Sequence, residues 1–514
     1  MAPQQQMTPA AKLHWRLEPI AARIERFCEQ HETSILAVWT LIYFAGTMRR
    51  AMAKPFWYDE ILTLLEARQP NLHAAMHALG DVDWMPPASH FTFYLTGKLL
   101  GFGEVAFRIP LMIAFGVFCI CLYFFARRRV GVFFALTAML LPYASAFQSY
   151  SYEARTYAFL LGFSGVALLA WQSAIERIQR PWSLFGIAAG IAGAIAFQYW
   201  AVLIYLPLAG AEAYRSLRRR RIDWPIWIAF IAGGTPTVLL LPLILHGVKS
   251  WVSYAGMRAH PVDYITSYSI AFRAGLAFAL PAALLLAAWF IGRGYKEEPA
   301  GTRQAVIPRY EWIAVTILLL LPVAAVSIAL IVPPHSFSLR YAAPVVAGYA
   351  LLGSFLAARL AGKRSSIGLA CVLAALAPFL YLMTQPVRFK DPFQRFRGLQ
   401  QRLQDGPVAF EDPVPYLKVW YYTPDRLKPH LVCIRDVPPL DIRHDPLYHL
   451  REFQELGIPF VQYADFVRPG TNFPFYPDIG RHKSRLVRAI EAGGGSVERI
   501  DSSPPRPLML AHIR

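Results

Sequence analysis

Long apolar runs recur along this chain from about residue 34 to residue 384, and they restrict its fold more than any other feature. A helix needs about 20 apolar residues to cross the hydrocarbon core of a bilayer. Charged residues make up only 16% of the 514 residues, whereas soluble domains carry about 25%. The sequence therefore predicts an α-helical polytopic membrane protein with about 11 transmembrane helices. The expected spans are 34–48, 109–126, 130–147, 154–172, 183–199, 200–214, 225–246, 270–292, 311–332, 341–360 and 366–384.

Clusters of Lys and Arg between the apolar runs give the expected orientation. Cytoplasmic loops of membrane proteins are enriched in these residues, so we assign the clusters and the N-terminus to the cytoplasm. An odd number of spans then puts the C-terminal domain outside the cytoplasm. This topology accounts for the formal net charge of +18 without nucleic-acid binding. Arg49, Arg50 and Lys54 break the charge rule locally. The clusters are Arg127–Arg129; Arg177 and Arg180; Arg215 and Arg218–Arg221; Arg293, Lys296, Arg303 and Arg309; and Arg359, Lys363 and Arg364.

The segment 183–214 is the least regular part of this pattern. At 1.5 Å per residue a single helix of this length would extend about 48 Å, which is too long for one span and short for two. Both flanks are basic, so an even number of crossings fits the charge rule better. We therefore expect two short helices with a break near Gln198–Tyr199–Trp200.

The distribution of apolar and charged residues along the sequence divides the chain into three parts. Residues 1–33 form a basic N-terminus whose amphipathic stretch 11–29 either lies on the cytoplasmic membrane surface or is a frayed tail. Residues 34–384 form the transmembrane domain, with an uncleaved anchor as its first span and a first outer loop, 51–107, that holds interfacial helices. Residues 385–514 alternate strand-like and helix-like pieces, which predicts a small extracytoplasmic α/β domain.

Asp59 and Glu60 are the first candidates for a functional site. They follow the first span by some ten residues on its outer side, in the stretch FWYDEILTLLEA. Ionisable groups at or near membrane depth are costly, so such groups are candidates for function. The alternative is a helix N-cap, because Asp is favoured there and acids suit the first turn of a helix.

Two further clusters are expected on the same face of the membrane. Glu153 and Arg155 lie where the fourth span begins, and an internal ion pair is their alternative role. Arg340 and Tyr341 begin the tenth span, where the arginine either anchors the interface or grips a phosphate through its planar guanidinium group. Structural charges scattered at random would have no reason to gather on one face.

Metal binding has weaker support. A set of His and Asp residues in the first outer loop lacks a recognised ligand pattern, and the polar face of an interfacial helix is the alternative. Five scattered cysteines show no CxxC or zinc spacing. We therefore expect neither a metal site nor another cofactor, with a divalent ion as the alternative. The residues of that set are His73, His77, Asp81, Asp83 and His90.

Four motifs resemble the bacterial branch of the GT-C superfamily of membrane glycosyltransferases. They are YDE after the first span, then MPPASHFTFYLTGKLLGFGEVAFRIP, then SYEARTYAFLL, then RYAAP, over about residues 30–350. The similar proteins are protein O-mannosyltransferases, lipid A aminoarabinose transferase and rhizobial galacturonosyltransferases, a group like glycosyltransferase family 39. The chain departs from the family at Met85, where His is usual, at Tyr152, where Gln is usual, and at Gln198–Tyr199, where His-Tyr is common.

The resemblance implies a polyprenyl-phosphate sugar as donor and an envelope glycan, lipid A, another lipid or a protein as acceptor, with inversion at the anomeric carbon. It implies a multi-pass protein of the bacterial inner membrane, acting on the non-cytoplasmic face. Asp59 would be the general base, and Glu60 and Glu153 would position hydroxyl groups. Arg155 and Arg340, beside Tyr341, would hold the donor phosphate.

Two other classes of function compete with this one. A transporter or lipid-carrier flippase would use the charges to line a translocation path, but such proteins often show repeated halves or charges in mid-span. A non-catalytic membrane scaffold would use its outer domain to bind a partner. The paired carboxylates and the clustering of charges on one face favour the glycosyltransferase.

Overall fold

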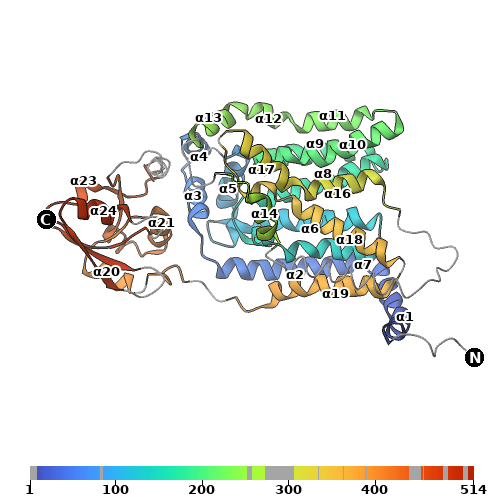
Figure 1. The fold of residues 1–514 in the computed structure, drawn as a ribbon, viewed down its shortest axis with the longest axis horizontal. Helices are drawn as coiled ribbons and strands as arrows, with labels where there is room; N and C mark the ends of the chain where they lie inside the picture. The colour runs from blue at the N-terminus through green and yellow to red at the C-terminus, as the bar shows by residue number, and fades with distance from the viewer. Residues whose placement is uncertain are drawn as a thin grey trace, which may run out of the picture. The chain divides into compact units, whose positions relative to one another are not determined.

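The computed structural model divides into two compact units (Figure 1). The first contains Met1–Arg50, Arg108–Leu245 and Met257–Pro386, and the second contains Ala51–Phe107, His246–Gly256 and Val387–Arg514. The first outer loop, which the sequence suggested as part of the membrane domain, thus lies in the same unit as the C-terminal residues. The structure describes residues 9–81, 85–251, 258–272, 306–333, 335–362, 364–387, 391–396, 398–438, 453–454, 456–478, 484–501 and 507–514.

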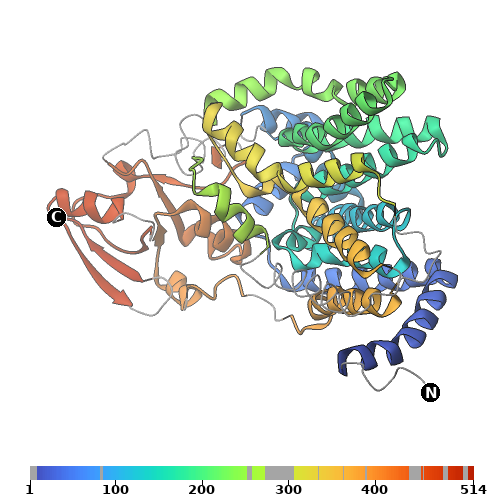
Figure 2. The same cartoon turned by 45° about the vertical axis from the view of Figure 1, so that its right-hand side comes forward.

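The first unit is built from helices, as the apolar runs predict. Figure 1 shows α2 and α19 along one edge of it, and Figure 2 shows the same helices from another side. Most of the expected span 270–292 lies outside the described residues. The helices are α1 Pro9–Gln30, α2 Glu32–Ala53, α6 Ile109–Arg127, α7 Val132–Leu140, α8 Tyr157–Ile175, α9 Arg180–Phe197, α10 Tyr205–Arg219, α11 Trp224–Gly233, α12 Thr235–Leu239, α13 Leu241–Trp251, α14 Asp263–Ala271, α16 Arg309–Leu319, α17 Leu321–Ile331, α18 Val345–Ala361 and α19 Ser365–Thr384.

Four helices of the described residues are long and apolar enough to cross a membrane without help from a neighbour. Three bent pairs raise the number to as many as seven if each pair is one span. The expectation of about 11 spans therefore stays a prediction, while the helical membrane-protein fold is confirmed. The four are Ala106–Arg127, α8, α9 and α19, and the bent pairs are Val132–Ala144 with Ala146–Tyr152, Trp224–Leu239 with Leu241–Val248, and Arg309–Leu319 with Leu321–Ile331.

The break expected near residues 198–200 is confirmed. Helix α9 ends at Phe197, and Gln198 is extended, with φ −157° and ψ 118°. A short 3₁₀ helix, η5 (Tyr199–Ile204), then leads into α10. The extended residue interrupts the helical hydrogen bonds, so the two halves do not form one long helix.

The local exception to the charge rule has a structural explanation. Arg50 donates from Nε to the carbonyl of Leu382 at 2.7 Å, and Arg49 donates to the carbonyl of Gln385 at 3.0 Å. The last carbonyls of a helix lack partners within it and carry a partial negative charge. These two arginines therefore satisfy carbonyl groups at the C-terminal end of α19.

The second unit contains a six-stranded mixed sheet in the order β3-β2-β1-β4-β6-β5. Strands β3, β2, β1 and β4 pair in parallel, whereas β6 pairs antiparallel with β4 and β5. The small C-terminal α/β region expected from the sequence is thus confirmed. The strands are β1 Val408–Phe410, β2 Leu431–Arg435, β3 Val461–Gln462, β4 Asn472–Tyr476, β5 Ser496–Asp501 and β6 Leu508–His512.

Helices of two origins accompany this sheet within the second unit. One set comes from the C-terminal residues, and the other comes from the first outer loop. The C-terminal helices are α20 Leu399–Asp405, α21 Pro413–Tyr422, α23 Tyr463–Phe466 and α24 Arg485–Ala492. The loop helices are α3 Tyr58–Ala67, α4 Leu72–Asp81 and α5 Pro87–Leu100.

Candidate functional site

The predicted site residues fall into two groups. Glu153, Arg155, Arg340 and Tyr341 belong to the first unit, and Asp59 and Glu60 belong to the second.

Two short 3₁₀ helices carry the group in the first unit. The first, η4 (Ala146–Tyr152), ends at Glu153, and Arg155 follows two residues later, just before α8. The second, η7 (Leu339–Ala342), holds Arg340 immediately before α18. Short 3₁₀ turns at the beginnings of long helices fix the direction in which the chain enters them. Both arginines are half-buried.

Arg155 and Arg340 converge on one aromatic ring. Their Cζ atoms lie 5.7 Å and 5.5 Å from the centre of the Tyr157 ring, within the range of a cation–π interaction. The Cζ atom of Arg340 also lies 6.0 Å from the centre of the Tyr341 ring. The structure therefore brings together three of the predicted residues around Tyr157, which the sequence had not singled out.

The guanidinium groups of Arg155 and Arg340 interact electrostatically. Burial opposes the charge of Arg340, but its interactions with Tyr157, Tyr341 and Tyr150 outweigh burial and raise its pKa. An arginine stays charged in proteins over the whole physiological pH range. The site thus holds two permanent positive charges beside the same tyrosines.

Further aromatic rings surround these arginines. Trp200 of η5 stacks on Tyr341, with ring centres 5.2 Å apart and planes only 3° from parallel. Tyr150 packs on Tyr157 at 4.8 Å, and it lies within electrostatic range of Glu153 and Arg340. The break in the segment 183–214 was visible in the sequence, but nothing local showed that it brings Trp200 to Tyr341.

The two acids of the second unit occupy consecutive positions in the first turn of α3. Asp59 is the second residue of this helix and is half-buried, while Glu60 is the third and is fully buried. The N-cap is Trp57, whose backbone N–H donates to Oε2 of Glu60 at 3.3 Å. The N-cap role considered for Asp59 is therefore wrong, because Glu60 is the acid that satisfies the helix terminus.

Helix α21 of the C-terminal part holds the segment just before these acids. The backbone N–H of Phe56 donates to the hydroxyl of Tyr422 at 2.6 Å, and that hydroxyl donates to Glu104 at 2.9 Å. Nearby, Arg68 at the end of α3 donates to the hydroxyl of Tyr421 at 3.3 Å. The C-terminal domain had given no hint of a role in the site. These hydrogen bonds connect it to both ends of the helix that carries Asp59.

The residues considered for a metal site take other positions. Nε2 of His90 faces Glu66 at 2.9 Å, and its Nδ1 faces Ser89 Oγ at 3.1 Å. Asp83 lies outside the described residues, as do the side chains of His77 and Asp81. No group of three or more His, Cys, Asp or Glu side chains that could hold a metal ion occurs in the described part of the chain.

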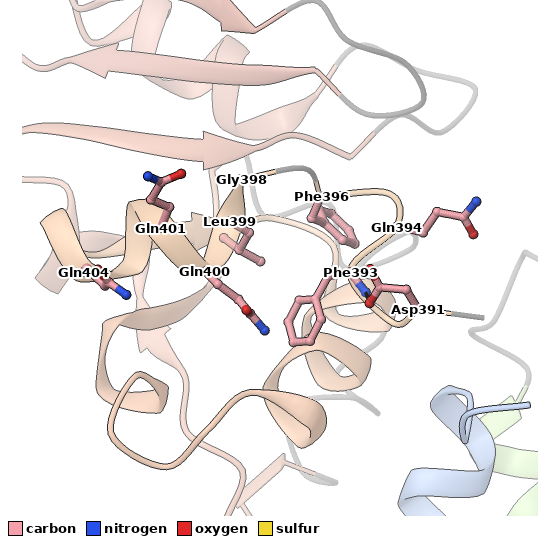
Figure 3. A pocket seen from close by; sticks show the side chains of 9 residues that line it. All are labelled: Asp391, Phe393, Gln394, Phe396, Gly398, Leu399, Gln400, Gln401 and Gln404. Carbon is pink, nitrogen blue, oxygen red and sulfur yellow. Dashed lines mark hydrogen bonds between the residues drawn. The ribbon is translucent and has the colours of Figure 1, made fainter. Parts of the chain in front are cut away.

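A hollow of about 680 Å³ opens on the C-terminal part of the second unit (Figure 3). Four glutamines line it together with the rings of Phe393 and Phe396 and the carboxylate of Asp391. None of the predicted site residues lines it. The lining residues are Asp391, Phe393, Gln394, Phe396, Gly398, Leu399, Gln400, Gln401 and Gln404.

Comparison with known proteins supports the resemblance seen in the sequence. The family described as dolichyl-phosphate-mannose-protein mannosyltransferase matches residues 85–246. Curated proteins give no match to the chain. The structure of ArnT from Cupriavidus metallidurans in the apo state is similar, with a TM-score of 0.55 and 12% identity over 94% of this chain and 98% of that chain.

The structure of the same protein bound to undecaprenyl phosphate is also similar, with a TM-score of 0.54 and 14% identity over 93% of this chain and 98% of that chain. At this identity the likeness concerns the fold. The family match adds sequence similarity over the region that includes α5, η4 and the start of α8. The chain therefore has the fold of the GT-C membrane glycosyltransferases, and its residues 85–246 match a mannosyltransferase family of that superfamily.

Proposed function

We propose that this protein transfers a sugar from a polyprenyl-phosphate donor to an envelope acceptor on the non-cytoplasmic face of a bacterial inner membrane. The acceptor is lipid A, another glycan, a lipid or a protein. Nucleotide sugars are cytoplasmic, so an enzyme that acts on the other face needs a donor carried by a lipid.

The convergence of Arg155 and Arg340 on Tyr157 carries this proposal. Two half-buried guanidinium groups beside one ring repel each other and are stabilised when an anion joins them. Guanidinium groups match phosphate oxygens in geometry and bind them through two parallel hydrogen bonds. We assign this cluster to the phosphate of the donor, with Tyr341 next to it. The similar ArnT structure is bound to undecaprenyl phosphate, which agrees with this assignment.

We assign Asp59 as the general base. As the hydroxyl oxygen of the acceptor attacks the anomeric carbon, the Asp59 carboxylate takes its proton. The bond between the anomeric carbon and the phosphate oxygen breaks on the opposite face, so the configuration inverts. Arg155 and Arg340 stabilise the negative charge of the departing polyprenyl phosphate. Glu60 shapes the first turn of α3 beside Asp59, and Glu153 positions a sugar or acceptor hydroxyl.

A transporter or flippase is the alternative class. Both the family match and the fold favour the glycosyltransferase. The two classes also differ in products, because a flippase moves the lipid carrier across the bilayer without breaking the bond between sugar and phosphate.

The proposal is tested with the purified full-length chain in vesicles. Each of a panel of radiolabelled polyprenyl-phosphate sugars is added with extracted envelope lipids, glycans and proteins, and label in the acceptor fraction is counted. Mass spectrometry of envelope glycans from a deletion strain then identifies the sugar that is lost. We expect transfer from one donor, abolished in Asp59→Asn. Movement of intact donor across the bilayer without transfer would support the flippase instead.

The orientation is tested separately. Reporter fusions after Arg221 and after Arg514 should report the cytoplasmic and the non-cytoplasmic side, respectively. A cytoplasmic signal after Arg514 would contradict the odd number of spans and the outer location of the site.

A further inference from the structure

Helix α1 exposes an apolar stripe. Four large apolar side chains recur at spacings of three and four residues and are 37% to 56% exposed: Leu17, Ile20, Ile24 and Phe27. Residues at this spacing lie on one face of a helix. Exposed apolar residues that occur singly are normal on a protein surface, but a continuous stripe of this kind marks a surface that contacts something else.

The acidic side chains of α1 point the other way, toward the protein. Glu18 accepts from the backbone N–H groups of Ser365 and Ser366 at 2.7 Å and 3.0 Å, and Glu25 accepts from the Ser365 hydroxyl. Glu29 pairs with Arg127 at 3.4 Å. The three acids of the helix are thus engaged in contacts with the rest of the first unit, although 43% of the Glu29 side chain stays exposed.

Arginines remain on the outer side of α1. Arg23 and Arg26 are both exposed, and Arg26 donates from Nε to the carbonyl of Ala22 one turn earlier at 3.3 Å. On a helical wheel they follow the apolar stripe on the side away from Glu18 and Glu25. The exposed surface of α1 therefore combines a row of apolar side chains with a row of positive charges.

The position of α1 in the first unit places this surface at the ends of the helical bundle. Glu18 binds the first backbone N–H groups of α19, a helix that is long and apolar enough to cross a membrane. A Cβ atom at Gly131, the N-cap of α7, would lie 2.7 Å from Oε1 of Glu25. Helix α1 thus packs across the beginnings of α7 and α19, and both views show it turned away from the direction of α2 and α19 (Figures 1 and 2).

We propose that α1 is an in-plane membrane helix that binds the anionic phospholipid surface at this end of the bundle. A helix that crosses the ends of transmembrane helices lies at the level of the headgroups. There an amphipathic helix buries its apolar face about 5–10 Å deep, while arginines extend to the headgroup phosphates. Anionic lipids attract basic residues within about a Debye length of the membrane surface.

The depth of α1 is measured on the full-length protein in nanodiscs. Phe27→Cys is made together with Cys28→Ser, and the new thiol is labelled with an environment-sensitive fluorophore. Quenching by spin-labelled lipids is compared with the same label at Asp425→Cys, whose side chain is 94% exposed in the second unit. We expect strong quenching at position 27 and little at position 425. Equal weak quenching at both positions would overturn the proposal.

The preference for anionic lipid is measured by repeating the experiment in pure phosphatidylcholine and in a mixture with phosphatidylglycerol. We expect the anionic lipid to increase quenching at position 27. The increase should disappear in Arg23→Gln with Arg26→Gln and persist in Arg23→Lys with Arg26→Lys. No response of the native arginines to the anionic lipid would refute the headgroup contact. Crosslinking between two chains through position 27, without quenching, would show that a second copy covers the stripe.

Discussion

Nε2 of His90 lies 2.9 Å from a carboxylate oxygen of Glu66, and this pair joins α5 to α3 within the second unit. The side chains are only 4% and 2% exposed, so the contact is shielded from water. Ser89 engages the other ring nitrogen of His90. Helix α3 also carries Asp59, the proposed base, in its first turn. The contact between His90 and Glu66 therefore helps to hold this helix in position against α5.

Removing one partner of this pair should destabilise the second unit. In His90→Phe the Glu66 carboxylate stays buried without its imidazole, which typically costs about 3–5 kcal/mol. The double variant Glu66→Leu with His90→Phe should recover much of this loss, because no charge is then left behind. Thermal unfolding of the purified protein in detergent measures the stability of the single variant and of the double variant. Equal stability of His90→Phe and the native chain would show that the pair contributes nothing.

Asp59→Asn should abolish transfer without unfolding the protein. Asn keeps the shape of the side chain but cannot accept a proton, and a general base contributes about 10²–10⁴-fold in rate. The structure assigns the helix terminus to Glu60 and Trp57, so loss of activity in Asp59→Asn would not be explained by loss of a cap. Glu60→Gln should lose less transfer. Normal turnover by well-expressed Asp59→Asn protein would remove the base assignment.

Arg340→Ala should weaken use of the lipid-phosphate donor more than Arg340→Lys. Losing a charged partner in a desolvated site costs about 2–5 kcal/mol, and lysine restores the charge without the planar guanidinium. Donor titrations in the vesicle assay give KM and kcat for each variant. Arg359→Ala is the matched control, because Arg359 is an exposed arginine in the last turn of α18, the helix that follows Arg340. Unchanged donor kinetics in Arg340→Ala would leave Arg340 as an interface anchor.

Tyr422→Phe should reduce transfer although this residue lies in the C-terminal part. The variant removes the hydroxyl that links the Phe56 backbone to Glu104, so the segment leading to Asp59 loses a fixed position. A buried hydrogen bond contributes about 1 kcal/mol, and more when a charged group takes part. We expect a lower kcat with little change in donor KM. Lys428→Gln, which breaks the Lys428–Asp425 surface pair, should leave transfer unchanged.

The Cys433 thiol should resist alkylation in the folded protein. Burial in strand β2 raises its pKa from 9.0 to about 12, and only the thiolate reacts. At pH 8 roughly one thiol in 10⁴ would be ionised when folded, against about one in ten when unfolded. The unfolded thiol ionises first, so this group makes the protein less stable as pH rises from 9 toward 12. Mass spectrometry after iodoacetamide treatment measures the alkylation of Cys433. Rapid labelling of Cys433 in the native protein would contradict the expected resistance.

The sequence by itself determined the membrane class, the helical bundle, the C-terminal α/β region and the break after Phe197. Each of these depends on hydropathy, charge or turn residues within about 20 neighbouring positions, so local patterns carry them. The motifs that contain Asp59, Arg155 and Arg340 were also recognisable, since ionisable side chains stand out against apolar runs.

Only the tertiary structure decided how these side chains meet. Arg155 and Arg340 lie far apart in the sequence and share Tyr157, and His90 faces Glu66 instead of a metal-binding set. The roles of Asp59 and Glu60 separate only when the exact first residue of α3 is known. Such pairings depend on how distant helices pack and on which buried polar groups find partners, and no periodicity along the chain encodes them.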